Sequence, residues 1–421
     1  MSRFKRLILN ILLFPVFGLF GIYASSTNPN LKSTAAELVN IFYDKTALKE
    51  GKPFNMLEQF AVKSRNIPQG AGDEIDWWKV VPIPVASDYG VLTEGQSPAA
   101  TLLNYQRVKA LVKGYGLVVT LSEFLQIISI DPKMASTAQS LGIHRAKTIN
   151  RMYWGCLAQN LYPLRVTANA AYECTDTVET SGTNSTSVVF DSVSGITNGT
   201  VGVLVMTGGN NFGMGGLATY TTAGTIFTLS ATAPSYILNE ACVVGDTYKF
   251  ASSTGLTATD VLTCAVLAKS VTILQNNLAA PYGDGYFGSI LSPFTQYDVR
   301  NDSEWINADH YSGSKKLYNG EVGSWGGIRF VMDSLPWRST AGTMQTYAAA
   351  GAVFHTPVFG QECYAGVRFN GVQDKLITKS KEQTGDPLET YSTMGWKAYL
   401  VPKVLNALNG VQILSGATNI S

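Results

Sequence analysis

Alternating apolar and polar positions predict a long two-stranded arm early in the chain. The segment EIDWWKVV, residues 74–81, has the character of a β-strand, and Pro82 and Pro84 end its regular pairing. The segment LTEGQSP, residues 92–98, supplies turn chemistry, and the chain returns through residues 107–113. One face of the return strand carries Val108, Ala110 and Val112, and the other carries Arg107, Lys109, Leu111 and Lys113. Because an isolated hairpin is only marginally stable in water, we expect this arm to lie on another surface, such as a neighbouring subunit.

Two segments have the three–four apolar spacing of amphipathic helices. The first begins at Asp131, an N-cap residue, with Pro132 at the first helical position, and is predicted to reach about Asn160. Its apolar stripe comprises Met134, Ala138, Leu141, Ile149, Met152 and Cys156. A helix of this length is expected to act as a strut, that is, a long support for the rest of the subunit. The second is predicted from Thr259 to Pro281, with a stripe of Cys264, Leu267, Val271, Leu274 and Leu278.

The segment between these helices, residues 166–255, has a different composition. From Ser181 to Ser230 the only charged residue is Asp191, and Ser, Thr and Gly dominate. Short runs such as SVVF, GVLVMT and GTIFTLS alternate with Gly and Asn turns, which predicts an all-β structure. A disordered linker is the alternative, but the β-branched and aromatic content disfavours it. We interpret the segment as an inserted β domain in a scaffold that is otherwise α+β.

The overall charge indicates a surface that is covered by partners. Charged residues make up 14% of the 421 positions, well below the roughly 25% of an ordinary soluble domain. Hydrophobic residues make up 45%, and the net charge is +1. Such a surface suits a protein that contacts partners or a membrane better than one that remains a free monomer. The balanced charge argues against a dedicated nucleic-acid binder and leaves room for a local basic patch.

The amino terminus has the pattern of a secretion signal. The basic stretch from Arg3 to Arg6 precedes an apolar run from Leu7 to Tyr23 and the small residues 24–26. Asn10 and Pro15 make this run a poor membrane-spanning helix, which needs about 20 apolar residues. Together with the Ser- and Thr-rich insertion, the pattern supports a secreted or membrane-anchored β-rich adhesin as an alternative function.

No arrangement of residues in the sequence predicts an enzyme. Walker A, HExxH and GxSxG motifs do not occur, and the three histidines, His144, His310 and His355, are scattered. The five cysteines form no CxxC pair and are interpreted as buried thiols. The residue types would allow Cys363 to act as a nucleophile with His355 as its base, but this pairing is disfavoured because it requires a specific arrangement in space. The aspartates Asp44, Asp298, Asp302 and Asp309 fit no compact calcium loop. We expect no catalytic activity, no metal site, no cofactor and no small-molecule substrate.

A series of short blocks after Pro281 is built from Gly turns, Trp, Tyr and alternating apolar residues. In order they are GDGYFGSILSP, RNDSEWINADHY, LYNGEVGSWGGIRFV and DPLETYSTMGWKAY. Further blocks precede them: AELVNIFYDKTALKEGKPFNMLEQFAVKSRNIPQGAGDEIDWWKVVPIP, VLTEGQSPAA, VKGYGLVVTLSEFL and IDPKM. In order and spacing, these blocks resemble the major capsid proteins of tailed bacteriophages, specifically the N4-type family. The resemblance covers roughly residues 35–165 and 256–405; the inserted β domain and the apolar amino terminus lie outside it.

The resemblance implies the HK97-type capsid fold, which has an extended hairpin called the E-loop and a long spine helix. It implies this division of the chain: an apolar amino-terminal arm and linker, 1–34; an amino-terminal helical segment, 35–65; the E-loop, 66–118; a peripheral domain with the spine helix, 119–165; the inserted β domain, 166–255; a peripheral-domain helix, 256–280; an axial domain, 281–365; and carboxy-terminal strands that complete the core, 366–421.

The resemblance also implies a structural function without catalysis. The chain would be a self-assembling subunit of an icosahedral virion capsid, assembled in the host cytoplasm around packaged double-stranded DNA. Its partners would be other copies of itself in hexamers and pentamers, portal, scaffolding or decoration proteins, and DNA held by non-specific electrostatic contact. The residues expected at intersubunit contacts lie on the arm: Trp77, Trp78, Thr93, Glu94, Gly95, Arg107, Lys109 and Lys113.

Overall fold

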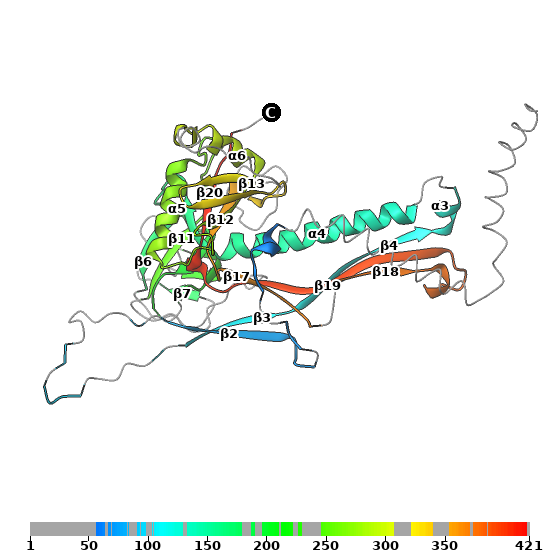
Figure 1. Cartoon of the computed structure of the whole chain (residues 1–421), viewed down its shortest axis with the longest axis horizontal. Helices are drawn as coiled ribbons and strands as arrows, with labels where there is room; N and C mark the ends of the chain where they lie inside the picture. The colour runs from blue at the N-terminus through cyan, green and yellow to red at the C-terminus, as the bar shows by residue number, and fades with distance from the viewer. Residues whose placement is uncertain are drawn as a thin grey trace, which may run out of the picture. The chain divides into compact units, whose positions relative to one another are not determined.

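The computed structural model divides the chain into two compact units (Figure 1). The described residues are 56–63, 66–68, 70–81, 83, 91–92, 94–97, 103, 105–128, 133–178, 187–189, 196–209, 212–221, 226–229, 246–306, 321–339, 353–370, 374–384 and 386–418. The predicted amino-terminal arm and the predicted helix start at Asp131 lie outside them. Among the described helices, none is long and apolar enough to cross a membrane.

The first unit combines Gly116–Arg145 with Asp374–Ala398. Its elements, three of which continue into the second unit, are β4 (Lys113–Ser122), α3 (Glu123–Ile128), α4 (Lys133–Asn160), β18 (Lys375–Lys379), the 3-10 turn η4 (Lys381–Gln383) and β19 (Tyr391–Val404). In the sheet, β19 pairs with both β18 and β4. The α4 helix packs on this sheet, where the Trp396 indole Nε1 donates to His144 Nδ1 at 3.3 Å and Arg145 pairs with Asp374 at 2.7 Å.

The predicted strut helix is confirmed as α4, which ends at Asn160 as expected. Four members of its apolar stripe, Ala138, Leu141, Ile149 and Cys156, are buried, and Met134 and Met152 are half-buried. In the second unit, Asn150 Nδ2 and the Trp154 indole Nε1 both donate to Asp333 Oδ2 at 2.7 Å. The buried carboxylate therefore ties the end of α4 to the loop after β14.

The second unit contains the remaining described elements in Pro53–Tyr115, Ala146–Gln373 and Tyr399–Ser421. Outside the insertion they are η2 (Leu57–Gln59), β1 (Val62–Lys63), β2 (Glu74–Val80), β3 (Tyr105–Leu111), β5 (Tyr162–Arg165), α5 (Cys264–Asn276), β12 (Phe287–Leu291), α6 (Pro293–Arg300), β13 (Glu321–Trp325), β14 (Ile328–Met332), β15 (Arg338–Ser339), β16 (Val353–Phe359), β17 (Tyr364–Arg368), η5 (Ala407–Asn409) and β20 (Gly410–Ser415).

A seven-stranded mixed sheet with the order β13-β14-β12-β16-β20-β5 forms the centre of this unit, with β15 paired to β16. The α5 helix packs on it, and Leu267 and Leu274 are fully buried in a core shared with Val358 and Ile413. Strands from before and after the insertion lie in this one sheet, because β5, which precedes the insertion, pairs in parallel with β20 near the carboxyl terminus.

The second predicted helix is shorter than expected. It starts at Cys264 instead of Thr259, because Asp260 accepts hydrogen bonds from Thr257 and holds a turn before the helix. It ends at Asn276, and Leu278 has a φ of 56°. Leu278 is 90% exposed, so its predicted place on the apolar stripe is wrong.

The insertion forms the predicted all-β structure. Its strands are β6 (Glu173–Thr177), β7 (Ser187–Val189), β8 (Val201–Met206), β9 (Gly215–Thr221), β10 (Ile226–Leu229) and β11 (Thr247–Ala251). They form an antiparallel sheet with the order β6-β11-β8-β9-β10-β7. Phe227 is fully buried, and its ring lies 4.5 Å from Phe250 and 5.0 Å from Tyr220 between centroids. Aromatic packing thus supplies the core of a segment whose central residues, 181–230, carry a single charge.

Candidate functional site

The β2–β3 hairpin is the predicted two-stranded arm, and its two faces have different environments. The strands are antiparallel, with Trp77 opposite Val108 and Trp78 opposite Arg107. Side chains at successive positions point to opposite faces, so the adjacent tryptophans are separated by the sheet. On the inner face, Ile75 and Trp77 pack on a cluster in the same subunit that contains Val112.

Lys79 also lies on the inner face and joins the hairpin to the insertion. Its ammonium donates to the Phe212 carbonyl at 3.2 Å and lies 4.9 Å from the centre of the Phe212 ring. Burial lowers the pKa of Lys79 to about 8. Phe212 belongs to the turn between β8 and β9, so the inserted sheet contacts the end of the hairpin where β2 ends and β3 begins.

The outer face of the hairpin, by contrast, presents large apolar side chains to solvent. Trp78 is 66% exposed, and Val80, Tyr105 and Leu111 are also exposed. Between them, Arg107 Nη2 pairs with Asp76 Oδ2 at 2.9 Å. Exposed ion pairs of this kind contribute at most about 1 kcal/mol, so this face gains little from its charges. A strip of exposed aromatic and aliphatic groups on a paired strand is typical of an interaction surface.

The other predicted contact residues fall in three places. Lys109 is exposed on the outer face, opposite Asp76. Glu94 and Gly95 form an exposed turn in which Gly95 has a φ of 80°, a conformation that favours glycine. Thr93 lies outside the described residues.

The prediction that the return strand continues through Lys113 is wrong. The strand ends at Leu111, and Lys113 begins β4, which pairs with β19. Val112 is the last residue that follows the hairpin register, since its amide donates to the Asp73 carbonyl at 2.9 Å and its side chain is buried with Ile67. The chain therefore leaves the hairpin at Val112.

The residues considered for nucleophilic chemistry are held in structural roles. His355 is buried in β16, its Nε2 lies 3.0 Å from Ser339 Oγ, and burial lowers its pKa to about 3. Burial raises the pKa of the Cys363 thiol. A cysteine nucleophile needs a lowered thiol pKa and a basic histidine, and both shifts here run in the opposite direction.

The candidate aspartates that the structure describes bind backbone amides. Asp298 Oδ2 accepts from Thr418 at 3.0 Å, and Asp302 Oδ2 accepts from Cys264 at 2.8 Å. Asp44, Asp309 and His310 lie outside the described residues. Within the part of the chain that is described, no group of three or more His, Cys, Asp and Glu side chains is placed to hold a metal ion.

A second exposed apolar surface, which the sequence did not predict, lies on α3. Phe124 and Ile127 are 74% and 72% exposed, and Leu388 in the turn before β19 is also exposed. The segment SEFLQII contains no turn signal and has the composition of a buried strand or helix, so its pattern gave no reason to expect exposure.

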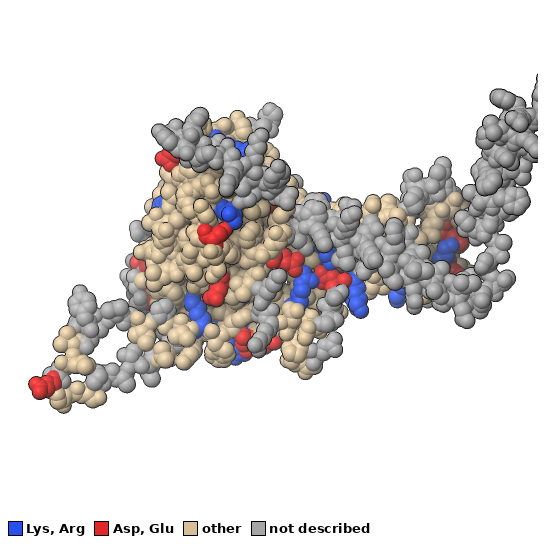
Figure 2. All heavy atoms as spheres, in the orientation of Figure 1, with Lys and Arg blue, Asp and Glu red and all other residues tan. Residues whose placement is uncertain are grey.

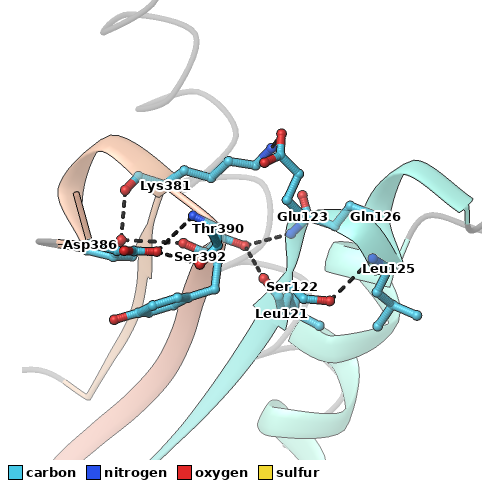
Figure 3. Close-up of polar contacts among 11 residues, drawn as sticks. Leu121, Ser122, Glu123, Leu125, Gln126, Lys381, Asp386, Thr390 and Ser392 are labelled. Carbon is cyan, nitrogen blue, oxygen red and sulfur yellow. Dashed lines mark hydrogen bonds and ion pairs between the residues drawn. The ribbon is translucent and has the colours of Figure 1, made fainter. Parts of the chain in front are cut away.

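Polar contacts hold α3 against the turn between β18 and β19 (Figure 3). Figure 3 shows Lys381 reaching from this turn to Glu123, with 2.6 Å between Nζ and Oε1. The Glu123 amide donates to the Thr390 carbonyl at 2.8 Å. Asp386 accepts hydrogen bonds from the side chain and the amide of Thr390, which lower its pKa. These contacts therefore fix α3, with its exposed apolar side chains, to the turn between β18 and β19.

Comparison with known proteins gives similarity in structure only. No protein-family model matches the chain, and no curated protein matches it. The capsid structure of Cyanophage Pam1 is 14% identical with a TM-score of 0.49, over 83% of this chain and 87% of that chain. The capsid of Ralstonia phage GP4 is 12% identical with a TM-score of 0.48, over 85% of this chain and 87% of that chain. The capsid structure of Cyanophage P-SCSP1u is 13% identical with a TM-score of 0.46, over 84% and 86% of the two chains.

Proposed function

We propose that this chain is a structural subunit that assembles with copies of itself into a closed capsid. The observation that carries the proposal is the outer face of the β2–β3 hairpin, where Trp78 and its apolar neighbours are uncovered in the single chain. The inner face of the same hairpin is packed on its own subunit. The hairpin is therefore anchored on one side and available to a partner on the other.

The surface composition supports a partner that covers much of the subunit. Lys, Arg, Asp and Glu together form only 14% of the chain, and on the face shown in Figure 2 their side chains are sparse among uncharged ones. A protein with few surface charges and exposed apolar groups tends to associate. The sequence blocks that resemble tailed-phage major capsid proteins point to the same kind of assembly.

The finer proposal is an icosahedral virion shell of hexamers and pentamers around double-stranded DNA. Ring contacts of the head-to-tail kind close when the rotation between subunits allows it, and a hairpin with one exposed apolar face is suited to such contacts. Portal, scaffolding or decoration proteins and the packaged DNA are proposed as further partners on the sequence resemblance alone. The adhesin alternative depends on the amino-terminal segment, which lies outside the described residues, and on the Ser- and Thr-rich insertion, whose β-sheet is compatible with either function.

Sedimentation velocity of the purified full-length chain tests this proposal. Over increasing protein concentration we expect subunits to give way to one fast, uniform species, which negative-stain images show as closed particles. A single slow species at every concentration would contradict the proposed function. A protein released to the periplasm with its amino terminus cleaved after Ala24 or Ser26 would favour the adhesin instead.

A further inference from the structure

The inner face of the β2–β3 hairpin is covered by two different parts of the subunit. Toward one end, Trp77 packs on the cluster that contains Val112. At the other end, where β2 finishes and β3 begins, Lys79 lies opposite Gln106, which is only 5% exposed. The Lys79 ammonium there contacts the carbonyl and the ring of Phe212, a residue of the insertion. The insertion therefore lies against the hairpin on the side away from its exposed apolar face.

The β8–β9 turn that carries Phe212 is itself bonded to the central part of the subunit. The Gly213 amide donates to the Met206 carbonyl at 2.9 Å, which closes the turn. The Gly213 carbonyl accepts from the Ala407 amide at 3.0 Å. Ala407 begins η5, and η5 leads directly into β20 of the seven-stranded sheet. Two consecutive residues of the insertion thus connect the hairpin to the central sheet.

Space at this contact is so tight that the turn needs a glycine. Gly213 is buried and has a φ of 74°, a conformation that favours glycine. A Cβ built on it would overlap Asn406 Oδ1 and would lie 2.7 Å from Lys79 Nζ. Asn406 is held in place, because its Oδ1 accepts from the Leu408 amide at 3.3 Å. Side chains of the hairpin and of the segment before β20 therefore meet at one residue of the insertion.

The contact also favours a cation at position 79. A buried ammonium without a partner is costly, and here the Phe212 carbonyl accepts from it at 3.2 Å while the centre of the ring lies 4.9 Å away. An uncharged side chain of similar size could fill the same space but would lose both interactions. The chemistry of Lys79 therefore affects how firmly the turn holds the hairpin.

We propose that the β8–β9 turn of the insertion positions the hairpin for assembly, with Lys79 as the positioning residue. By fixing the hairpin against the central sheet of the same subunit, the turn orders the outer face that carries Trp78 before a partner covers it. Ordering before binding lowers the entropic cost of association. The consequence for assembly rests on the proposed function, whereas the ordering of the hairpin is a property of the isolated subunit.

Hydrogen exchange of the unassembled full-length subunit, read by mass spectrometry of its peptides, measures this ordering. Gly213→Ala places a methyl group against Lys79 and Asn406, and should speed exchange in peptides from β2 and β3 about tenfold. Peptides from β12 and β16 should stay within about twofold of the wild type. The subunit concentration needed for assembly should rise about tenfold.

Gly199→Ala is the matched control for Gly213→Ala. Gly199 also lies in the insertion and has a φ of 78°, but a Cβ built on it has nothing within 4 Å. The control therefore has the same backbone strain without the contact to the hairpin. It should leave both the exchange of β2 and β3 and the assembly concentration unchanged.

Substitutions of Lys79 separate positioning from packing. Lys79→Met keeps most of the side-chain volume but loses the ammonium, and should speed exchange in β2 and β3 about fivefold and raise the assembly concentration by a similar factor. Lys79→Arg keeps a cation that can donate to the Phe212 carbonyl and lie over its ring, and should stay within about twofold of the wild type. A role in packing alone would make Lys79→Met behave like the wild type. Circular dichroism and thermal unfolding check that each variant folds, and if Gly213→Ala does not fold, the two Lys79 variants decide.

The two readouts distinguish failure of this inference from failure of the proposed function. If β2 and β3 exchange equally fast in the wild type and in Lys79→Met, or if Gly199→Ala speeds their exchange as much as Gly213→Ala does, the turn does not position the hairpin. If exchange rises but the assembly concentration is unchanged, the ordering does not serve assembly and the inference is also overturned. A wild type that forms no particles refutes the proposed function, and the exchange measurement then still decides whether the turn orders the hairpin.

Discussion

Replacement of Trp78 by alanine should weaken assembly without weakening the subunit. A tryptophan buries on the order of 200 Å² when it is fully covered. Trp78 is 66% exposed, so a partner that covers it removes about 130 Å² from water. At about 25 cal/mol per Å², this corresponds to about 3 kcal/mol for each contact. Since every 1.4 kcal/mol is roughly a tenfold change, the variant should need on the order of 100-fold more subunit to assemble.

Trp77→Ala is the matched control, because the two tryptophans are neighbours on opposite faces of one strand. Trp77 packs on the cluster formed by Ile67, Val112 and Val367 of its own subunit. Its loss should lower the free energy of unfolding by about 2 to 4 kcal/mol. The subunit concentration at which light scattering rises measures assembly, and urea denaturation of the unassembled subunit measures stability. If Trp78→Ala assembles like the wild type, or if it destabilises the subunit as much as Trp77→Ala does, the assignment of the two faces is refuted.

Three further outcomes follow from individual contacts. Burial lowers the pKa of Lys79 from 10.5 to about 8, so between these pH values Lys79 is protonated more in the unfolded chain than in the folded chain. The free energy of unfolding of the wild type, relative to that of Lys79→Met, should therefore rise as the pH passes from 8 to 10, which denaturation experiments measure. Asp333→Ala leaves the buried donors of Asn150 and Trp154 without their acceptor and should reduce the free energy of unfolding by about 3 kcal/mol. The near-ultraviolet circular dichroism of Trp154 should change, and an unaltered spectrum would contradict this role of Asp333. The pKa of Asp386 is lowered, so the hydrogen bonds to its carboxylate stabilise the turn above the ordinary aspartate pKa and are lost as the pH falls. Asp386→Asn should therefore speed hydrogen exchange of the Thr390 amide near neutral pH. Equal exchange in the two proteins would show that these bonds do not order the turn.

The parts of the fold that the sequence predicted are those that depend on local periodicity. The hairpin alternation and the stripe on α4 follow from residues a few positions apart, and both are present in the structure. The insertion was recognisable because its composition changes abruptly and its β-branched runs lie between Gly and Asn turns. Each of these signals is contained within the element that it describes.

The errors arose where distant residues decide the local structure. The alternation of the hairpin continues through Val112 to Lys113, but from Lys113 the chain pairs with β19, a strand almost 300 residues further along, and not with β2. The turn before α5 is held by Asp260, which also accepts a hydrogen bond from Thr167 at 2.5 Å, and the spacing of apolar residues does not encode a contact between residues so far apart. Alternation shows that Trp77 and Trp78 lie on opposite faces of the hairpin but not which face the subunit itself covers, so the packing of Trp77 on its own subunit could not be predicted from the sequence.

A cryo-electron microscopy reconstruction of the particles formed by the full-length chain tests the central claim most directly. The account predicts a closed shell in which a neighbouring copy covers Trp78 and the outer face of the β2–β3 hairpin. Closed particles in which that face points to solvent, or a preparation that contains no closed particles, would contradict it.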